Sequence, residues 1–319
     1  MPIYYTPIAS ESIGVRSLSL FVETPDARIL IDAGVSLGPR FGLLPHPLEY
    51  HALKKVRNLL RNYAEKADII TISHYHFDHY TAAWPNIEAK WSWSSIDEAK
   101  IIYKDKIILA KDYKDSINAT QRKRGYIFHK IITNFAKKVI FADLINFTLG
   151  ETNIIFSQPF PHGEDGTSLG YVLLLNIRHG EDNLLYCSDV QGPISNLTLQ
   201  YILKINPKVL VISGPPIYLK DYKVDSKAIE IGLKNLSIIT QQTPYTLIDH
   251  HILRSEEGLK EINKFDRKRV KTFAEHLGLK NNLLEAKRDK LYEENPPDKD
   301  FQKWLKLSPH QQRAQLPPI

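Results

Sequence analysis

The sequence contains very little cysteine and no long hydrophobic segment. Its single cysteine, Cys187, excludes an intramolecular disulfide, and no apolar run is long enough to cross a bilayer. The N-terminal residues 1–5 lack the basic and then apolar pattern of a secretory signal. With 43% hydrophobic and 24% charged residues, the composition is that of an ordinary folded protein. We therefore expect a cytoplasmic protein with no membrane partner, whose 319 residues bury a sizeable core.

The positive charge is concentrated in one part of the chain. The formal net charge is +6, yet residues 100–138 contain 11 lysines and arginines against 3 acidic residues, a net of +8. Such a local excess favours an anionic partner, and nucleic acid is one candidate. A solvated helix surface explains the same charges equally well. Within this segment Arg122, Lys123 and Arg124 form a candidate phosphate-binding and therefore substrate-binding cluster.

The C-terminal part of the chain is also rich in charge. From Ile252 to the end the chain has 15 lysines and arginines and 11 acidic residues, and its pattern is mainly helical. We therefore divide the chain into a catalytic domain at residues 1–255 and a helical C-terminal extension at residues 256–319. The extension is open to three interpretations: a solvated helical surface, an arm of a homo-oligomer, or a contact with nucleic acid.

The most specific signal is a group of histidines and an aspartate directly after a predicted strand. Residues 67–72 are apolar and β-branched, which is typical of a buried strand. His74 and His76 follow two positions apart, so on an extended backbone they point to the same side, and Asp78 and His79 come next. This spacing can hold two metal ions side by side. The competing interpretation is a histidine-rich turn without metal, which would leave buried imidazoles in need of hydrogen-bond partners.

The pattern His-x-His-x-Asp-His after an apolar strand resembles the signature of the metallo-β-lactamase superfamily. Four other segments resemble further motifs of that superfamily: residues 28–34, 160–163, 186–189 and 247–251. Residues 14–17, 188–193, 214–216 and 249–251 resemble, more closely, an uncharacterised archaeal family of predicted metal-dependent hydrolases in it. The resemblance covers residues 1–255 and implies an α/β fold, a four-layer αββα sandwich. It leaves residues 84–138 as a basic, aromatic insertion that follows the histidine loop and borders the cleft.

The resemblance also implies metal ligands at the ends of apolar runs. The implied set is His74, His76 and His162 for the first ion, Asp78 and His79 with His250 or His251 for the second, and Asp189 as a bridge. We lean to His250 because the last predicted strand reaches it first, with His251 as a hydrogen-bonding neighbour or general acid. The reverse assignment stays open. Asp32 is expected to brace the histidine loop without binding metal, and Asp249 to orient one of the two histidines.

The implied cofactor is a pair of divalent metal ions. Neutral imidazoles with few carboxylates suit Zn²⁺, while Fe and Mn are also compatible. Two carboxylates leave positive charge on two such ions, which stabilises a bridging hydroxide and attracts an anionic substrate. Asp78, Asp189 and His251 are the expected catalytic residues.

Three functions are compatible with these patterns. The first is a metal-dependent hydrolase of a phosphodiester or another anionic substrate, similar to a nuclease or phosphodiesterase. The alternative is a hydrolase of a small lactone or thioester, which the same metals would serve. The third is a non-enzymatic, metal-stabilised binding protein. A complete dinuclear ligand set argues against the third function, because a structural site is closed and usually mononuclear.

Two local expectations can be compared directly with a structure. Residues 139–148 are predicted to form one strand. Trp84, Trp91 and Trp93 are expected either to pack in the core or to form an aromatic wall beside the site.

Overall fold

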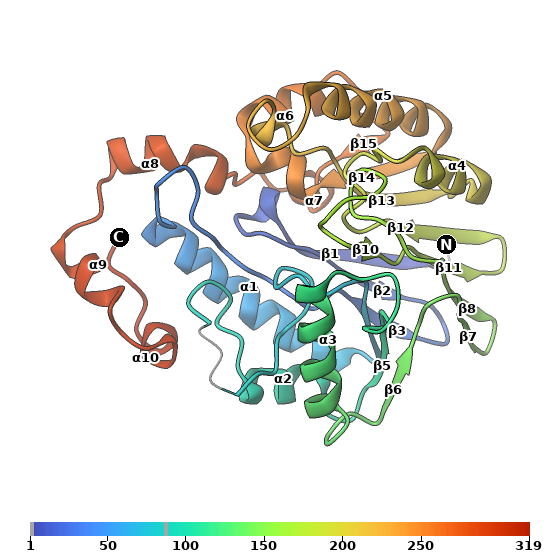
Figure 1. The fold of residues 1–319 in the computed structure, drawn as a ribbon, viewed down its shortest axis with the longest axis horizontal. Coiled ribbons are helices and arrows are strands. Elements are labelled where there is room, and N and C mark those ends of the chain that lie inside the picture. Colours follow the sequence, from blue (N-terminus) through green and yellow to red (C-terminus); the bar gives the residue numbers. More distant parts are fainter. Residues whose placement is uncertain (1–2, 86–88) are drawn as a thin grey trace.

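The computed structural model describes residues 3–85 and 89–319, and in this part of the chain two large β-sheets pack face to face (Figure 1). Residues 86–88 of the predicted insertion lie outside the described residues. The first sheet has its six described strands in sequence order. They are β1 (Tyr4–Ser10), β2 (Leu18–Glu23), β3 (Arg28–Ile31), β4 (Ile69–Ile72), β5 (Ile107–Ala110) and β6 (Lys138–Phe141). β1 to β3 are antiparallel, and β3 to β6 are parallel.

The second sheet has seven described strands in the order β15-β14-β13-β12-β11-β8-β7. They are β7 (Asn146–Leu149), β8 (Thr152–Phe156), β11 (Leu175–His179), β12 (Asp182–Tyr186), β13 (Val209–Ser213), β14 (Tyr245–Asp249) and β15 (Val270–Lys271). β12 to β15 are parallel, so their carboxyl ends meet at one edge of the sheet. The short strands β9 (Phe160–Pro161) and β10 (Tyr171–Val172) form a separate pair.

Helices cover the outer faces of both sheets (Figure 1). The helices that pack on the first sheet are α1 (Pro47–Lys66), α2 (Ile96–Tyr103) and α3 (Ala119–Ile132). Those on the second sheet are α4 (Asn196–Ile205), α5 (Ser226–Gln242) and α6 (Glu256–Ile262). The smaller described helices are η1 (Glu11–Ile13), η2 (Ile217–Leu219), η3 (His250–Arg254), α7 (Phe273–His276), η4 (Glu285–Lys287), α8 (Arg288–Glu294), α9 (Lys299–Trp304) and α10 (Pro309–Ala314).

The alternation of side chains along each strand builds three hydrophobic layers. In β3, Ile29 and Ile31 point between the sheets, whereas Leu30 points toward α1. In β12, Leu184 and Tyr186 join the layer between the sheets, and Leu185 faces α4 and α5. The result is helix, sheet, sheet, helix, which confirms the predicted four-layer αββα fold.

Helix α1 leads into β4 and so helps to position the histidine loop, residues 74–79, that follows this strand. The His46 side chain caps the first turn and Glu49 completes a capping box, while Pro47 occupies the first helical position. The apolar residues of the helix recur every three or four positions and pack on the first sheet. The helix ends at Lys66, and two residues separate it from β4.

Within the described ranges no helix has both the length and the apolar character needed to span a membrane.

The prediction of a single strand at residues 139–148 was wrong. The structure interrupts this segment, so that β6 belongs to the first sheet and β7 to the second. Asp143 lies at the break, where its carboxylate accepts hydrogen bonds from buried Lys111 and from the backbone N–H of Asp112. Leu144, the next residue, has a φ of 61°, which ends the extended conformation.

The segments on either side of the proposed domain boundary are closely packed together. β15 of residues 256–319 pairs with β14, and Phe301 and Trp304 pack around Tyr50 of α1. Arg288 donates two hydrogen bonds to buried Glu49, each 2.7 Å long. Within residues 84–138, β5 is an interior strand of the first sheet and α3 lies near the histidine loop. The exact division into a domain, an insertion and an extension stays a prediction.

Candidate metal centre

The loop after β4 carries the histidine cluster, and Asp32 holds this loop in place. Asp32 follows β3, which is the parallel neighbour of β4. Its carboxylate accepts hydrogen bonds from the Ser73 backbone N–H at 2.8 Å and the Ser73 hydroxyl at 2.5 Å. The same carboxylate lies 2.8 Å from His79 Nδ1 and accepts a 2.8 Å hydrogen bond from the Tyr186 hydroxyl. One buried carboxylate therefore fixes both the loop and the orientation of the His79 ring.

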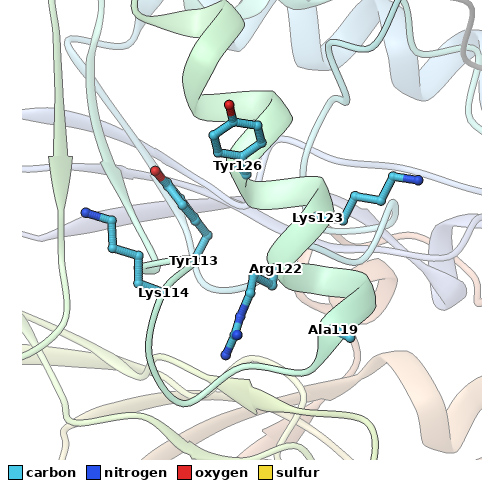
Figure 2. A pocket seen from close by; sticks show the side chains of 6 residues that line it. All are labelled: Tyr113, Lys114, Ala119, Arg122, Lys123 and Tyr126. Atoms are coloured by element: carbon cyan, nitrogen blue, oxygen red, sulfur yellow. The ribbon is translucent and has the colours of Figure 1, made fainter.

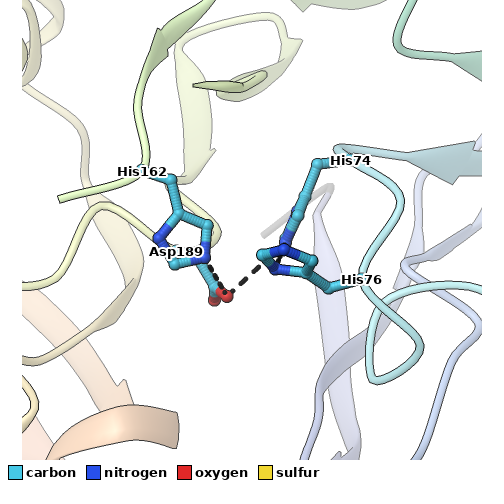
Figure 3. Close-up of side chains that lie close together, drawn as sticks. All are labelled: His74, His76, His162 and Asp189. Carbon is cyan, nitrogen blue, oxygen red and sulfur yellow. Dashed lines mark hydrogen bonds and ion pairs between the residues drawn. The ribbon is translucent and has the colours of Figure 1, made fainter. Parts of the chain in front are cut away.

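Four predicted ligands converge in a first cluster (Figure 3). His74 Nε2 and His76 Nδ1 are 3.0 Å apart, as the spacing of two residues predicts. His162 lies next to the end of the short strand β9, and its Nε2 is 3.1 Å from Asp189 Oδ2. The same carboxylate oxygen is 3.5 Å from His74 Nε2. One ligand atom from each of these four residues lies within 4.8 Å of the others, which is close enough for one metal ion.

A second cluster lies on the other side of Asp189. Asp78, His79 and His250 form a group whose ligand atoms are also within 4.8 Å of one another. His79 Nε2 and His250 Nε2 are 3.2 Å apart, and they lie 3.2 and 3.1 Å from Asp189 Oδ1. Asp189 thus turns one oxygen to each cluster, which is the geometry that a bridging carboxylate requires.

The chemistry of these side chains fits divalent metal ions. Among the described residues, His162 Nε2 and Asp189 Oδ1 are buried nitrogen and oxygen atoms without a hydrogen-bond partner. Burial lowers the pKa of His74 to about 4, so its ring is in the neutral form that binds metal. Burial alone would raise the pKa of Asp189, but nearby imidazoles, those of His250 and His79 first, hold that pKa well below its ordinary value. Despite burial, Asp189 raises the pKa of His79 well above its ordinary value and that of His250 to about 9, so metal binding would displace a proton from each of these rings. Imidazoles in their neutral form around an ionised carboxylate are the donors that Zn²⁺ prefers.

The two consecutive histidines take different positions. His250 adopts a φ of 64°, and its Nε2 is 3.8 Å from Asp78 Oδ2 in addition to its contacts with His79 and Asp189. His251 Nε2 lies 3.2 Å from Asp189 Oδ2, while its Nδ1 has no hydrogen-bond partner among the described residues. Burial and the charge of Arg254 hold the pKa of His251 well below its ordinary value. A neutral His251 is poorly suited to be a resting general acid.

Two charged residues that the sequence reasoning missed support this centre. Glu11 is 3% exposed, and its two carboxylate oxygens lie 2.9 and 2.8 Å from His250 Nδ1. Arg254 donates to Glu11 at 2.6 Å and to Asp78 Oδ2 at 3.1 Å. A weak signal for Arg254 was available, because it stands four residues after His250. Glu11 sits in a polar triplet, Ser10 to Ser12, that gave no such indication.

Asp249 contacts the backbone of His250 and not its ring. Its carboxylate accepts hydrogen bonds from the backbone N–H groups of Ser12, His250 and Phe273, at 3.1, 2.8 and 2.9 Å. It therefore holds the backbone around η3, and the carboxylate that contacts a histidine ring there is that of Glu11. The physical reason is that the φ of His250 turns its side chain away from the end of β14 and toward η1.

The predicted substrate-binding cluster is divided between two faces of α3. Arg124 lines a cavity of about 320 Å³ together with Arg16, Trp91 and the loop residues His76 and Asp78. Its guanidinium carbon lies 4.0 Å from the centroid of the Phe77 ring. The two neighbouring cations, at positions 122 and 123, line a different cavity on the outer face of the helix.

The tryptophans are divided in the same way. Trp93 is fully buried and stacks on Tyr50, with the ring centroids 6.0 Å apart. Trp91 lines the cavity beside the histidine loop, and Trp84 packs at the edge of the core against Phe77. Trp93 is therefore a core residue, whereas Trp91 both packs at the edge of the core and borders the cavity, so that a role as an aromatic wall stays a prediction.

Solved structures of metallo-β-lactamase-fold proteins align with much of the chain at low sequence identity. The YhfI protein of Bacillus subtilis is 17% identical with a TM-score of 0.46, covering 78% of this chain and 86% of that one. A diphosphatase of the PhnP family is 13% identical with a TM-score of 0.48, covering 85% and 94%. No family model matches the sequence.

Sequence relatives are much more similar. A UPF0282 protein of Methanocaldococcus jannaschii is 44% identical over 287 residues, which are 89% of this chain and 95% of the relative. UPF0282 proteins of Methanopyrus kandleri and Pyrococcus abyssi are 40% and 42% identical, covering 89% and 95% of this chain and 97% and 98% of the relatives. These relatives are archaeal, in agreement with the predicted resemblance. With 40–44% identity along almost the full length of these relatives, the chain belongs to the UPF0282 family.

Proposed function

We propose that the protein is a metal-dependent hydrolase with a dinuclear centre that cleaves phosphodiesters. The observation that carries the proposal is the gathering of six predicted ligands in two clusters, one on each side of the seventh, Asp189. His74, His76 and His162 would hold one ion, Asp78, His79 and His250 the other, and Asp189 would touch both. When bound, such a pair of divalent ions supplies an acidified water and an electrophile for hydrolysis.

The chain's own residues favour an anionic group beside this centre. The cavity of about 320 Å³ is lined by His76 and Asp78 and also by Arg16 and Arg124. Arg16 forms an ion pair with Glu285, with the nitrogen and oxygen 2.6 Å apart. Arg124 instead donates a hydrogen bond to the backbone oxygen of Tyr75 at 3.2 Å and stacks on the ring of Phe77. A guanidinium fixed in this way offers its planar edge to a phosphate. This arrangement favours a phosphodiester over a neutral lactone or thioester.

The test is hydrolysis of a generic substrate by the purified protein. We expect the protein to hydrolyse bis(p-nitrophenyl) phosphate and to contain two metal ions per chain by elemental analysis. Chelation with EDTA should remove the ions and abolish the hydrolysis. Adding Zn²⁺ or Mn²⁺ back should restore turnover, because the ligands stay in place through their hydrogen bonds to the rest of the fold. Lactone and thioester substrates tested in parallel identify the alternative. Diester turnover that survives complete chelation would refute the proposal.

A pair of variants separates the roles of the consecutive histidines. His250→Ala removes a ring that lies near both His79 and Asp189, so we expect about one ion fewer per chain. His251→Ala should retain both ions, since His251 belongs to neither proposed ligand set, although its ligand atom lies within 4.8 Å of those of Asp189 and His250. The metal content of the two variants, measured by mass spectrometry, shows which of the two histidines is a ligand. The opposite pattern, with the ion lost only from His251→Ala, would exchange the two assignments.

A further inference from the structure

The outer face of α3 carries a second cavity, separate from the candidate metal centre. It has a volume of about 490 Å³ and is lined by residues of the first two turns of the helix and of the loop before it: Tyr113, Lys114, Ala119, Arg122, Lys123 and Tyr126 (Figure 2). The four helical members stand at positions i, i+3, i+4 and i+7, which is the spacing of one helix face. They form a continuous surface, which we call the outer α3 surface.

The opposite face of the same helix contacts the histidine loop. Gln121 is buried, and its side-chain nitrogen lies 3.4 Å from His76 Nε2. Its side-chain oxygen accepts a hydrogen bond from the backbone N–H of Tyr75 at 2.9 Å. Because a helix with its side chains is about 10 Å in diameter, the outer α3 surface lies about one helix width from the candidate centre. A ligand on it can therefore extend to the centre if it is a polymer.

The outer α3 surface is positively charged without compensation. Lys114, Arg122 and Lys123 line it, and no carboxylate lines it. None of these three cations forms an ion pair with any residue in the described ranges, whereas other cations of the chain, such as Arg16 and Lys303, do. The neighbouring Asp143 is bound to Lys111 at 2.6 Å, and the carboxylate of Asp112 accepts from the backbone N–H of Lys114. Uncompensated cations on one concave surface favour an anion.

Aromatic rings on the same surface narrow the class of anion. Tyr126 is 51% exposed, and its ring lies edge to face with that of Tyr113, with the centroids 5.8 Å apart. Tyr113 is held in turn by His129 and Phe141, at centroid distances of 5.7 and 5.5 Å. An exposed ring on a fixed aromatic base offers a stacking surface to a nucleobase. Free phosphate and acidic peptides would use the cations but leave this ring unused.

We propose that the outer α3 surface binds single-stranded nucleic acid, with phosphates on Lys114, Arg122 and Lys123 and a base stacked on Tyr126. The inference rests on the proposed function in one respect, since it names a nucleic-acid strand as the substrate that reaches the phosphodiesterase centre. The binding itself does not depend on turnover, so the two proposals can fail separately.

The experiment measures strand binding by fluorescence anisotropy with the full-length protein. The probe is a labelled single-stranded RNA of about 12 nucleotides in mixed sequence, kept cold and checked on a gel for integrity. The variants are R122E/K123E and Tyr126→Ala, all at exposed positions, and the matched control is Lys234→Glu on α5. Thermal melts confirm that each variant is folded.

We expect R122E/K123E to weaken binding at least tenfold and Tyr126→Ala to weaken it about tenfold, while the control stays within twofold. The logarithm of the association constant should fall with the logarithm of salt concentration with a slope of about −2 for three phosphate contacts, and less steeply for the double variant. An equal loss in Lys234→Glu would overturn the inference in favour of non-specific attraction. Competition by poly-glutamate as strong as that by unlabelled RNA would overturn it in favour of an acidic peptide.

The two proposals have distinct failures. If the strand binds at the outer α3 surface but bis(p-nitrophenyl) phosphate is not hydrolysed, the proposed function is wrong and the binding inference stands. If the diester is hydrolysed but R122E/K123E binds RNA as well as the unchanged protein, only the inference is wrong.

Discussion

Asp189→Ala is expected to lose both metal ions and to reduce diester hydrolysis by at least about a thousandfold, which corresponds to about 4 kcal/mol of activation free energy. The reason is geometric. Its Oδ2 lies near His74 and His162, and its Oδ1 lies near His79 and His250, at distances of 3.1 to 3.5 Å. Removing it takes away the one carboxylate that both clusters share and leaves mostly neutral imidazoles, which hold divalent cations less tightly without a counter-charge.

Metal content by elemental analysis and the hydrolysis rate at saturating substrate check this expectation. Asp221→Ala provides a matched control, since it deletes an exposed carboxylate in the loop after η2. His76→Ala tests one side of the bridge and should lose the first ion. Two ions per chain in Asp189→Ala would show that the carboxylate is not a ligand.

A chain that ends at residue 255 is expected not to fold. The deletion removes β15 from the edge of the second sheet and takes away Phe301 and Trp304, whose loss costs about 3–5 kcal/mol each in comparable cores. It also leaves Glu49 without Arg288 at a site where both are almost fully buried, and a broken buried pair costs about 3–5 kcal/mol. The sum approaches the whole stability of a typical domain, about 5–15 kcal/mol.

A second, shorter truncation tests the same prediction in steps. A chain that ends at residue 294 keeps β15, Glu285 and Arg288 and loses only α9, α10 and the residues after α8. We expect it to fold with a lower free energy of unfolding in urea, by several kcal/mol, because the apolar surface of Tyr50 becomes exposed. If residues 1–255 alone were soluble, folded and equally stable, they would be an independent domain and the expectation would be wrong.

The elements that the sequence predicted well are those whose signal is local. The strand before His74 and the spacing of His74 and His76 depend on neighbouring residues, so the direction of those rings followed from backbone geometry. Glu11 could not be found in the same way, because it meets His250 across 239 positions of sequence. The prediction of a single strand at residues 139–148 failed for a related reason. The break between β6 and β7 depends on the contact of Asp143 with Lys111 in the chain after β5, which no local pattern indicates.

The carboxylate of Asp32 has a consequence for how the protein reaches its final state. It receives hydrogen bonds from Ser73 in one half of the sandwich and from Tyr186 in the other. The proposed ligands are divided between the halves, with His74 from the first and His162 and Asp189 from the second. If the proposed ligand sets are correct, we expect neither half to bind both ions on its own. Uptake of metal from solution should report the moment at which the two halves dock, so a stopped-flow signal from a metal indicator would time the last step of folding.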